Sequence, residues 1–247
     1  TLQLQVTNNE EAIKLTGEAM IVIDNSDSME ELVSGSDLTR KDLVLQSANS
    51  LVTRLLEDNS NLSIGVVGFS SSTDTSQEGT LQDAFLVSEL SNNVDELTNA
   101  ISNIDANGAR TDLDAGLTLA NEYFTETQNN KYMIVLTDGV PNIALDYDNV
   151  YYSDTVIENT RQTMLDLEDS GIQLYTVLTG ITEQEENDPA TGVSKTYGEI
   201  ISEIFGAPED PTAGRFYYIS DAEIEETISN TIYNELLPES VTYTDFT

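Results

Sequence analysis

The sequence predicts an α/β domain with a doubly wound, mostly parallel central sheet that carries helices on both faces. Apolar runs rich in branched residues alternate along the chain with longer amphipathic segments. Such alternation indicates βαβ crossovers, which place helices on both faces of a parallel sheet. Two of the apolar runs also end in oxygen-bearing side chains, and ligands bind at the carboxyl ends of strands in open α/β sheets.

Predicted strands and helices follow one another in a regular order. Short apolar runs between turn residues predict strands, whereas apolar residues three and four positions apart predict helices. The predicted strands are residues 19–23, 62–69, 84–90, 131–137, 172–178 and 215–219. The predicted helices are residues 40–57, 93–104, 113–124, 155–168, 197–205 and 222–237. The last helix ends at Pro238, because proline cannot continue a helix.

The chain divides into one main domain and two short terminal segments. Its 247 residues, of which 38% are apolar, can bury one sizeable core. The expected segments are a lead-in strand or linker at 1–17, the main domain at 18–237, and a linker or first strand of a following module at 238–247. In the lead-in, residues 1–6 alternate like an edge strand and residues 8–11 have the composition of a polar turn. Residues 182–196 are acidic and contain proline and glycine, which predicts an exposed insertion.

The charge and the composition exclude several classes of function. The chain has 45 acidic and 9 basic residues, and its formal charge of -36 repels nucleic acid and anionic membranes and attracts divalent cations or basic partners. It contains neither cysteine nor histidine, so thiol nucleophiles, imidazole bases, disulfides and the usual zinc sites are excluded. No stretch approaches the ~20 apolar residues of a membrane span, so we expect no membrane insertion by this segment.

Oxygen ligands from three segments are predicted to converge at one edge of the sheet. Asp24, Ser26 and Ser28 follow the first buried strand. Thr111 lies in a glycine-containing loop before a helix, and Asp138 follows a later buried strand. Carboxylates, hydroxyls and water suit a hard, octahedral cation such as Mg²⁺ or Mn²⁺. With at most two carboxylates around it, such an ion keeps positive charge and an open position for an external anion.

These residues resemble the metal-ion-dependent adhesion site of the von Willebrand factor type A (vWA) domain. The family pattern is Asp-x-Ser-x-Ser after the first buried strand, a threonine in a glycine-containing loop, and Asp-Gly after a later buried strand. It appears here at residues 24–28, 108–111 and 137–139, and the similarity spans roughly residues 18–237. Three motifs in the right order, each on the element type that the fold needs, argue against a chance match. The resemblance implies a Rossmann-like vWA fold.

The resemblance also implies roles for the site residues. Ser26 and Ser28 would ligate the metal directly, and Thr111 would do so directly or through water. Asp24 and Asp138 would act mainly through water. The implied cofactor is Mg²⁺, with Mn²⁺ or Ca²⁺ as alternatives, and a carboxylate from a partner protein would fill the last position.

By the same resemblance, the chain is expected to be a non-enzymatic adhesion or ligand-binding module. Its acidic, cysteine-free composition and strand-like tail resemble bacterial surface adhesins, which implies an extracellular location on a cell surface or pilus. The implied partner is a host or neighbouring-cell surface protein that offers a carboxylate. The helix at 222–237 is expected to shift along the sheet when Thr111 changes its coordination.

Three residues are candidates for a rim that contacts the partner, namely Arg110, Tyr147 and Tyr151. Arg110 would place a cation beside the site, but a local ion pair with Asp112 or Asp114 is the favoured interpretation. Tyrosines are favoured at interfaces. Tyr147 and Tyr151 could equally pack under their own loop.

Two other functions stay open at this point. One is an intracellular vWA scaffold that partners an ATPase, as in chelatase-like assemblies. The other is a metal-dependent phosphohydrolase, because an aspartate that ends a strand can also accept a phosphoryl group. The second ranks low, since Ser26 stands where the commonest such motif has a second aspartate and no general base is evident.

Overall fold

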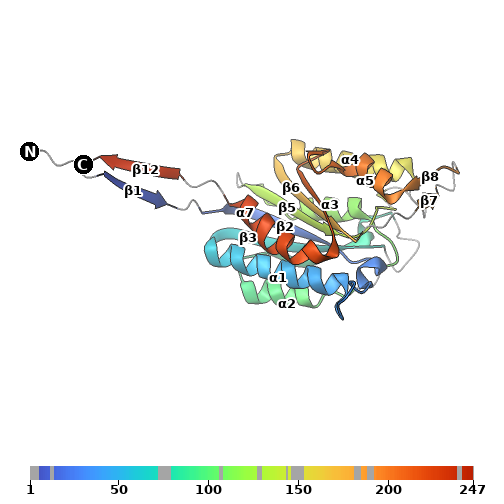
Figure 1. Ribbon diagram of the computed structural model, residues 1–247, viewed down its shortest axis with the longest axis horizontal. Helices are drawn as coiled ribbons and strands as arrows, with labels where there is room; N and C mark the ends of the chain where they lie inside the picture. Colours follow the sequence, from blue (N-terminus) through green and yellow to red (C-terminus); the bar gives the residue numbers. More distant parts are fainter. Residues whose placement is uncertain are drawn as a thin grey trace, which may run out of the picture.

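A six-stranded sheet forms the centre of the computed structural model, with strands in the order β11-β6-β5-β2-β3-β4 (Figure 1). The strands are β2 (Thr16–Asp24), β3 (Asn61–Phe69), β4 (Ala84–Ser91), β5 (Lys131–Thr137), β6 (Ile172–Thr179) and β11 (Arg215–Ile219). Neighbouring strands are parallel except for β3 and β4, which are antiparallel. The predicted mostly parallel sheet is therefore confirmed.

The structure describes residues 6–11, 14–71, 79–105, 108–126, 130–142, 144–145, 153–180, 185–187, 192–237 and 241–246. No helix within these ranges is both long enough and apolar enough to cross a membrane. The expected division of the chain into segments 1–17, 18–237 and 238–247 stays a prediction.

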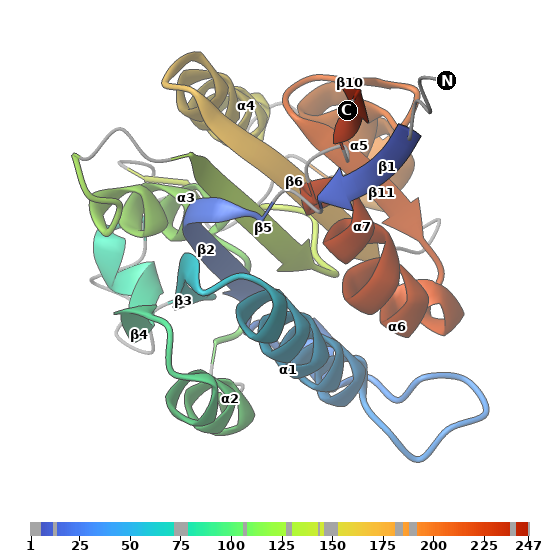
Figure 2. The same ribbon diagram turned by 90° about the vertical axis from the view of Figure 1, so that its left-hand side faces the viewer.

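Helices cover both faces of the sheet (Figure 2). The helices are α1 (Arg40–Asp58), α2 (Val94–Ser102), α3 (Leu113–Glu122), α4 (Asp154–Asp169) and α5 (Tyr197–Phe205). Apolar side chains of α1 and α2 pack on one face, and those of α3, α4 and α5 pack on the other. Strand β2 contributes to both cores, because Ile21 faces the first and Val22 the second. A strand buried on both faces explains why its sequence is a continuous apolar run.

The C-terminal helical segment, residues 221–236, packs beside α1 on the first face. The sequence pattern predicts one helix at 222–237, but the segment consists of four short pieces. These are a 3₁₀ turn (Asp221–Glu223), α6 (Ile224–Glu226), a π-helical turn (Thr227–Ile232) and α7 (Tyr233–Leu236). Arg54 of α1 donates to the carbonyl oxygen of Ser229, inside the π-helical turn. A side chain inserted at a helical carbonyl is one cause of such irregularity.

The two ends of the chain pair with each other. β1 (Val6–Glu11) and β12 (Val241–Phe246) form an antiparallel two-stranded ribbon that projects from the domain (Figure 1). The predicted polar turn at residues 8–11 is therefore wrong, because these residues are part of β1. Their partner comes from the far end of the chain, which a local pattern does not reveal. The expected strand at 1–6 lies mostly outside the described residues, whereas a strand in the C-terminal tail is present.

Small hairpins occupy the connection between β6 and β11. β7 (Glu185–Asn187) pairs antiparallel with β8 (Ser194–Thr196), inside the segment predicted as an acidic insertion. β9 (Gly206–Ala207) and β10 (Asp210–Pro211) form a second, shorter pair. Glu185, Asn187 and Ser194 of the first hairpin are exposed, as expected of an insertion, whereas Thr196 is half-buried. Its strands carry no apolar run, so the sequence pattern could not predict them.

Helix α1 begins with a capping box, which should stabilise the domain. The Thr39 hydroxyl accepts from the backbone N–H of Asp42 at 3.1 Å, and the Asp42 carboxylate accepts from Thr39 N at 2.9 Å. Thr39→Ala removes one of these bonds, so we expect the free energy of unfolding to fall by about 1 kcal/mol in urea denaturation. Ser50→Ala, at an exposed position later on the same helix, is the control and should change it by less than about 0.5 kcal/mol. Equal effects of the two substitutions would contradict the assignment.

Asp112, the N-cap of α3, makes the stability of the domain depend on pH. Burial raises the pKa of Asp112 to about 8, and the charges of Asp83 and Asp114 act in the same direction, against the hydrogen bond from Ala115 N. The folded protein therefore binds a proton here that the unfolded chain releases near pH 4, so stability falls as pH rises from about 4 to about 8.

Asp112→Asn keeps the acceptor oxygen for Ala115 N and removes the titrating group. We expect the slope of the unfolding free energy against pH, measured between pH 5 and 7 without divalent cations, to become less negative. The change should correspond to the loss of about one proton bound by the folded state. Asp37→Asn, an exposed site with the same change of charge, should leave the slope as it is in the wild type. If all three proteins share one slope, Asp112 does not carry the effect.

Candidate metal centre

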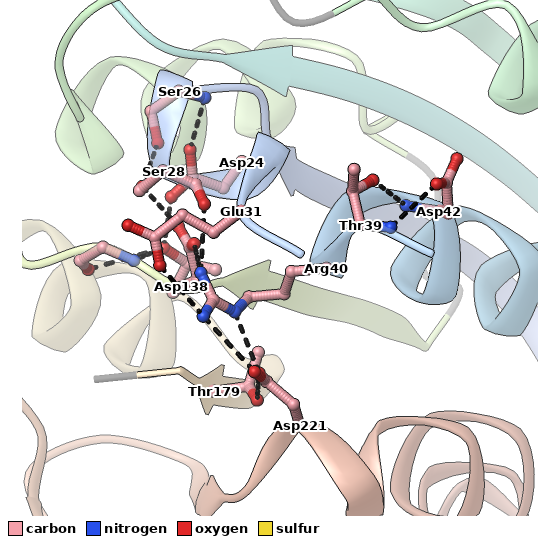
Figure 3. A network of polar contacts seen from close by, with 12 residues as sticks. Asp24, Ser26, Ser28, Glu31, Thr39, Arg40, Asp42, Asp138, Thr179 and Asp221 are labelled. Atoms are coloured by element: carbon pink, nitrogen blue, oxygen red, sulfur yellow. Dashed lines mark hydrogen bonds and ion pairs between the residues drawn. The ribbon is translucent and has the colours of Figure 1, made fainter. Parts of the chain in front are cut away.

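Asp24 and Asp138 come from adjacent strand ends. β2 and β5 pair in parallel, with Ile23 opposite Leu136, so the residues that follow leave the same edge of the sheet side by side. Both side chains are buried, Asp24 with 0% and Asp138 with 4% of its surface exposed. The predicted convergence of these two carboxylates is therefore present in the fold (Figure 3).

Hydrogen bonds hold Asp24 beneath the site. Its Oδ1 accepts from Ser26 N at 2.8 Å, and its Oδ2 accepts from the Thr137 hydroxyl at 2.5 Å. The bond to Ser26 N turns the chain at the end of β2, and a short 3₁₀ helix, Asp27–Glu30, follows. This turn brings the Ser26 and Ser28 hydroxyls to 3.1 Å from each other, and Ser28 Oγ donates to Asp138 Oδ1 at 2.8 Å.

Thr111 reaches the site from the loop before α3, and Asn142 fixes its position. Thr111 N donates to the Asn142 side-chain oxygen at 3.0 Å, and Asn142 N donates to Thr111 O at 3.1 Å. The α-carbon of Gly139 lies close by, since a β-carbon there would be 2.7 Å from Thr111 Oγ1 and 3.3 Å from Asp24 Oδ2. Glycine is therefore favoured after Asp138, because a side chain there would force Thr111 Oγ1 to move and would crowd Asp24.

A pocket of about 200 Å³ opens over these residues. Ser26, Ser28, Thr111 and Asp138 line it, while Asp24 lies below them. The structure thus brings four of the five predicted ligands to one pocket and places the fifth in direct contact with Ser26. Arg110 is half-buried and does not line the pocket, although its neighbours Ala109 and Thr111 do.

The remaining predictions for the rim are not decided by the described contacts. Asp112 accepts from Ala115 N, and Asp114 accepts from the Thr163 hydroxyl at 2.5 Å and from Leu145 N at 3.2 Å. The ion pair of Arg110 with either acid stays a prediction. Tyr147 and Tyr151 lie outside the described residues, so their role in a rim also stays a prediction.

The electrostatics of the site favour a bound cation. Burial raises the pKa of Asp138 to about 7, and the nearby charge of Asp24 adds to this effect. Burial also raises the pKa of Asp24, against the hydrogen bonds from Thr137 and Ser26. Both shifts mean that two adjacent negative charges are poorly solvated, which a positive charge between them would relieve. Two carboxylates and three hydroxyls fit a hard cation such as Mg²⁺.

No group of three or more acidic side chains in the described part of the chain is arranged to hold a metal ion. The predicted donor set therefore combines the two carboxylates of Asp24 and Asp138 with the hydroxyls of Ser26, Ser28 and Thr111.

Arg40, the first residue of α1, belongs to the site but was not predicted from the sequence. Its guanidinium contacts Asp138 Oδ2, donates to Ser28 O at 3.0 Å, and is 2.9 Å from Asp221 Oδ1 (Figure 3). Only 5% of Arg40 is exposed. One signal could have drawn attention to it, because a basic residue in the first turn of a helix is opposed by the helix dipole and needs acidic partners nearby. Asn142, which carried no such signal, was missed as well.

Comparisons with known proteins agree with this fold. Similar solved structures include the pilus adhesin SpaC from Lactobacillus rhamnosus GG, with 17% identity and a TM-score of 0.67 over 94% of this chain and 32% of that one. The PilB minor pilin from Streptococcus sanguinis has 17% identity and a TM-score of 0.60 over 90% of this chain and 62% of that one. The vWF domain of the type V pili tip protein Mfa5 from Porphyromonas gingivalis has 13% identity and a TM-score of 0.64 over 93% of this chain and 99% of that one.

This chain spans about a third of the SpaC chain and less than two thirds of PilB. At these identities the likeness establishes the fold alone. No curated protein sequence matches this chain. The family of the von Willebrand factor type A domain matches residues 19–230, which include every predicted ligand of the metal site, and the chain therefore belongs to the vWA family.

Proposed function

We propose that this domain is a non-enzymatic adhesion module that binds an acidic residue of a partner protein through a divalent cation, most simply Mg²⁺. The cation would be held by Asp24, Ser26, Ser28, Thr111 and Asp138. The observation that carries the proposal is the convergence of three hydroxyls and one buried carboxylate at one pocket, with a second buried carboxylate, Asp24, directly below them. Asp24 lies below the pocket, whereas the three hydroxyls are neutral ligands on the side of the pocket. A cation held by this set would therefore turn mostly neutral ligands toward the solvent, where a carboxylate of the partner can reach it.

The surroundings of the two aspartates favour binding over catalysis. Both oxygens of Asp24 accept hydrogen bonds, and its side chain is fully buried, which suits a supporting role better than that of a phosphoryl acceptor. Asp138 is held between Ser28 and Arg40, so it is poorly placed to move a proton. The chain also has no histidine or cysteine to serve as base or nucleophile.

We place this module on a bacterial cell surface or pilus. Support comes from the similar domains of SpaC, PilB and Mfa5, which are pilus proteins by name. The expected partner is a surface protein of a host or of a neighbouring cell that presents a carboxylate. This chain covers only part of SpaC and PilB. We therefore propose that it works within a larger assembly.

Magnesium binding tests the site directly. We expect wild-type protein to bind Mg²⁺ in isothermal titration calorimetry, and Asp24→Asn to weaken binding at least about tenfold, because a carboxylate that supports the ligands is lost. Asp27→Asn is the matched control, since Asp27 lies three residues away with an exposed side chain and does not line the pocket. It should bind like the wild type. If Asp24→Asn binds Mg²⁺ with the affinity of the wild type, the proposed metal site is wrong.

Capture of a carboxylate is a separate prediction. A blocked glutamate, N-acetylglutamate amide, should shift the backbone NMR signals of Ser28 and Thr111 when Mg²⁺ is present, because its side chain can reach the open face of the cation. The blocked glutamine analogue has the same shape without the charge and should not do so. Equal shifts with both compounds, or shifts that do not need Mg²⁺, would contradict the proposed mode of binding.

A further inference from the structure

Arg40 joins the candidate metal centre to the C-terminal helical segment. Its Nη1 contacts Asp138 Oδ2, while its Nε and Nη2 lie 2.9 and 3.3 Å from the two carboxylate oxygens of Asp221. Asp221 is the first residue of the segment 221–236. One guanidinium therefore bridges a predicted ligand of the metal and the start of a different structural element (Figure 3).

The guanidinium lies in a slot that the backbone leaves open for it. Gly180 follows β6 with φ +69, and a β-carbon there would be 2.2 Å from Arg40 Cζ. A side chain at position 180 would thus occupy the place of the guanidinium. With only 6% of its side chain exposed, Arg40 differs from a surface ion pair, whose contribution is small and screened by salt. The contact of Arg40 with Glu31, whose side chain is 65% exposed, is of that weaker kind.

Asp221 is held in place independently of Arg40. The Thr179 hydroxyl, at the end of β6, donates to Asp221 Oδ1 at 2.9 Å. Ser220 and Glu223 form a capping box around the same turn. The position of this carboxylate therefore reports the position of the C-terminal segment relative to the sheet.

We propose that Arg40 is a positioning residue shared between Asp138 and Asp221, and that this sharing sets how strongly its guanidinium competes with a cation for Asp138. The inference rests on the function proposed above. Arg40 and a bound cation would both be attracted to the negative charge of Asp138, so the guanidinium competes with the cation. Asp221 offsets this opposition, because it keeps a charged partner beside Arg40 when Asp138 turns to the cation. A buried guanidinium without a carboxylate partner is strongly unfavourable.

Opposite signs for two substitutions follow from this arrangement. Arg40→Gln should raise the affinity for Mg²⁺ about tenfold, because the competing positive charge is gone. Asp221→Asn should lower it about tenfold, because Arg40 then depends on Asp138 alone. In the double variant, the guanidinium that Asp221 normally holds is absent. The Mg²⁺ affinity of the double variant should therefore equal that of Arg40→Gln. Arg40→Lys keeps the charge but cannot span two carboxylates, so in its background Asp221→Asn should have little further effect.

The experiment measures Mg²⁺ affinity by calorimetry in the whole domain, with Glu225→Gln as the matched control. Glu225 lies four residues after Asp221 on the same segment, is exposed, and undergoes the same change of charge. It should bind like the wild type. Hydrogen exchange of residues 224–233 supplies a second readout, since Mg²⁺ should increase their protection in the wild type and not in Asp221→Asn.

The outcomes separate this inference from the proposed function. If the wild type does not bind Mg²⁺, the proposed function fails. If the wild type binds Mg²⁺ and Asp221→Asn binds it equally well, or loses no more than Glu225→Gln, the inference alone is overturned. If Arg40→Gln does not fold, the comparison of Asp221→Asn with Glu225→Gln, with and without Arg40→Lys, still decides it.

Discussion

Asp24 and Asp138 leave two neighbouring parallel strands and become buried within the same small volume. Two like charges taken out of water destabilise each other and the fold around them. Most features of the site reduce this unfavourable free energy. Ser26, Ser28 and Thr137 donate hydrogen bonds to the two carboxylates, and Arg40 adds a positive charge from a third element. Even so, the pKa of Asp138 stays raised to about 7. The site is thus left with a demand for further positive charge, which is the physical basis for the proposed cation.

The parts of this arrangement that the sequence could predict are local ones. β2 and β5 are buried apolar runs, and their oxygen-bearing residues follow within a few positions, so both the strands and the candidate ligands were visible in the sequence. Arg40 and Asn142 act on residues from distant segments, and their roles depend on a packing that no local pattern encodes. The same holds for β1, whose partner lies at the other end of the chain, and for the π-helical turn, where Arg54 reaches Ser229 from α1. Cation binding itself stays a prediction.

Two glycines show how tightly the backbone limits what the site can contain. At Gly139 the missing side chain makes room for Thr111 and Asp24, and at Gly180 it makes room for Arg40. The first explains in physical terms why an Asp-Gly pair follows the strand. The second lies outside every motif considered in the sequence, although it serves the same cluster of charges. Substitution at either position would disturb the site without removing any of its polar groups.

The ribbon of β1 and β12 also bears on how the domain would carry a load. β2 begins beside this ribbon and ends at Asp24, and its nine residues span about 30 Å, so the ribbon and the pocket lie at opposite ends of the domain. In the antiparallel register, Val6 lies opposite Phe246 at the outer end and Glu11 opposite Val241 at the inner end. Tension that pulls the two strands apart at the outer end would therefore break the paired residues one after another, from Val6–Phe246 to Glu11–Val241. The paired strands would therefore part before tension of this kind reached the central sheet.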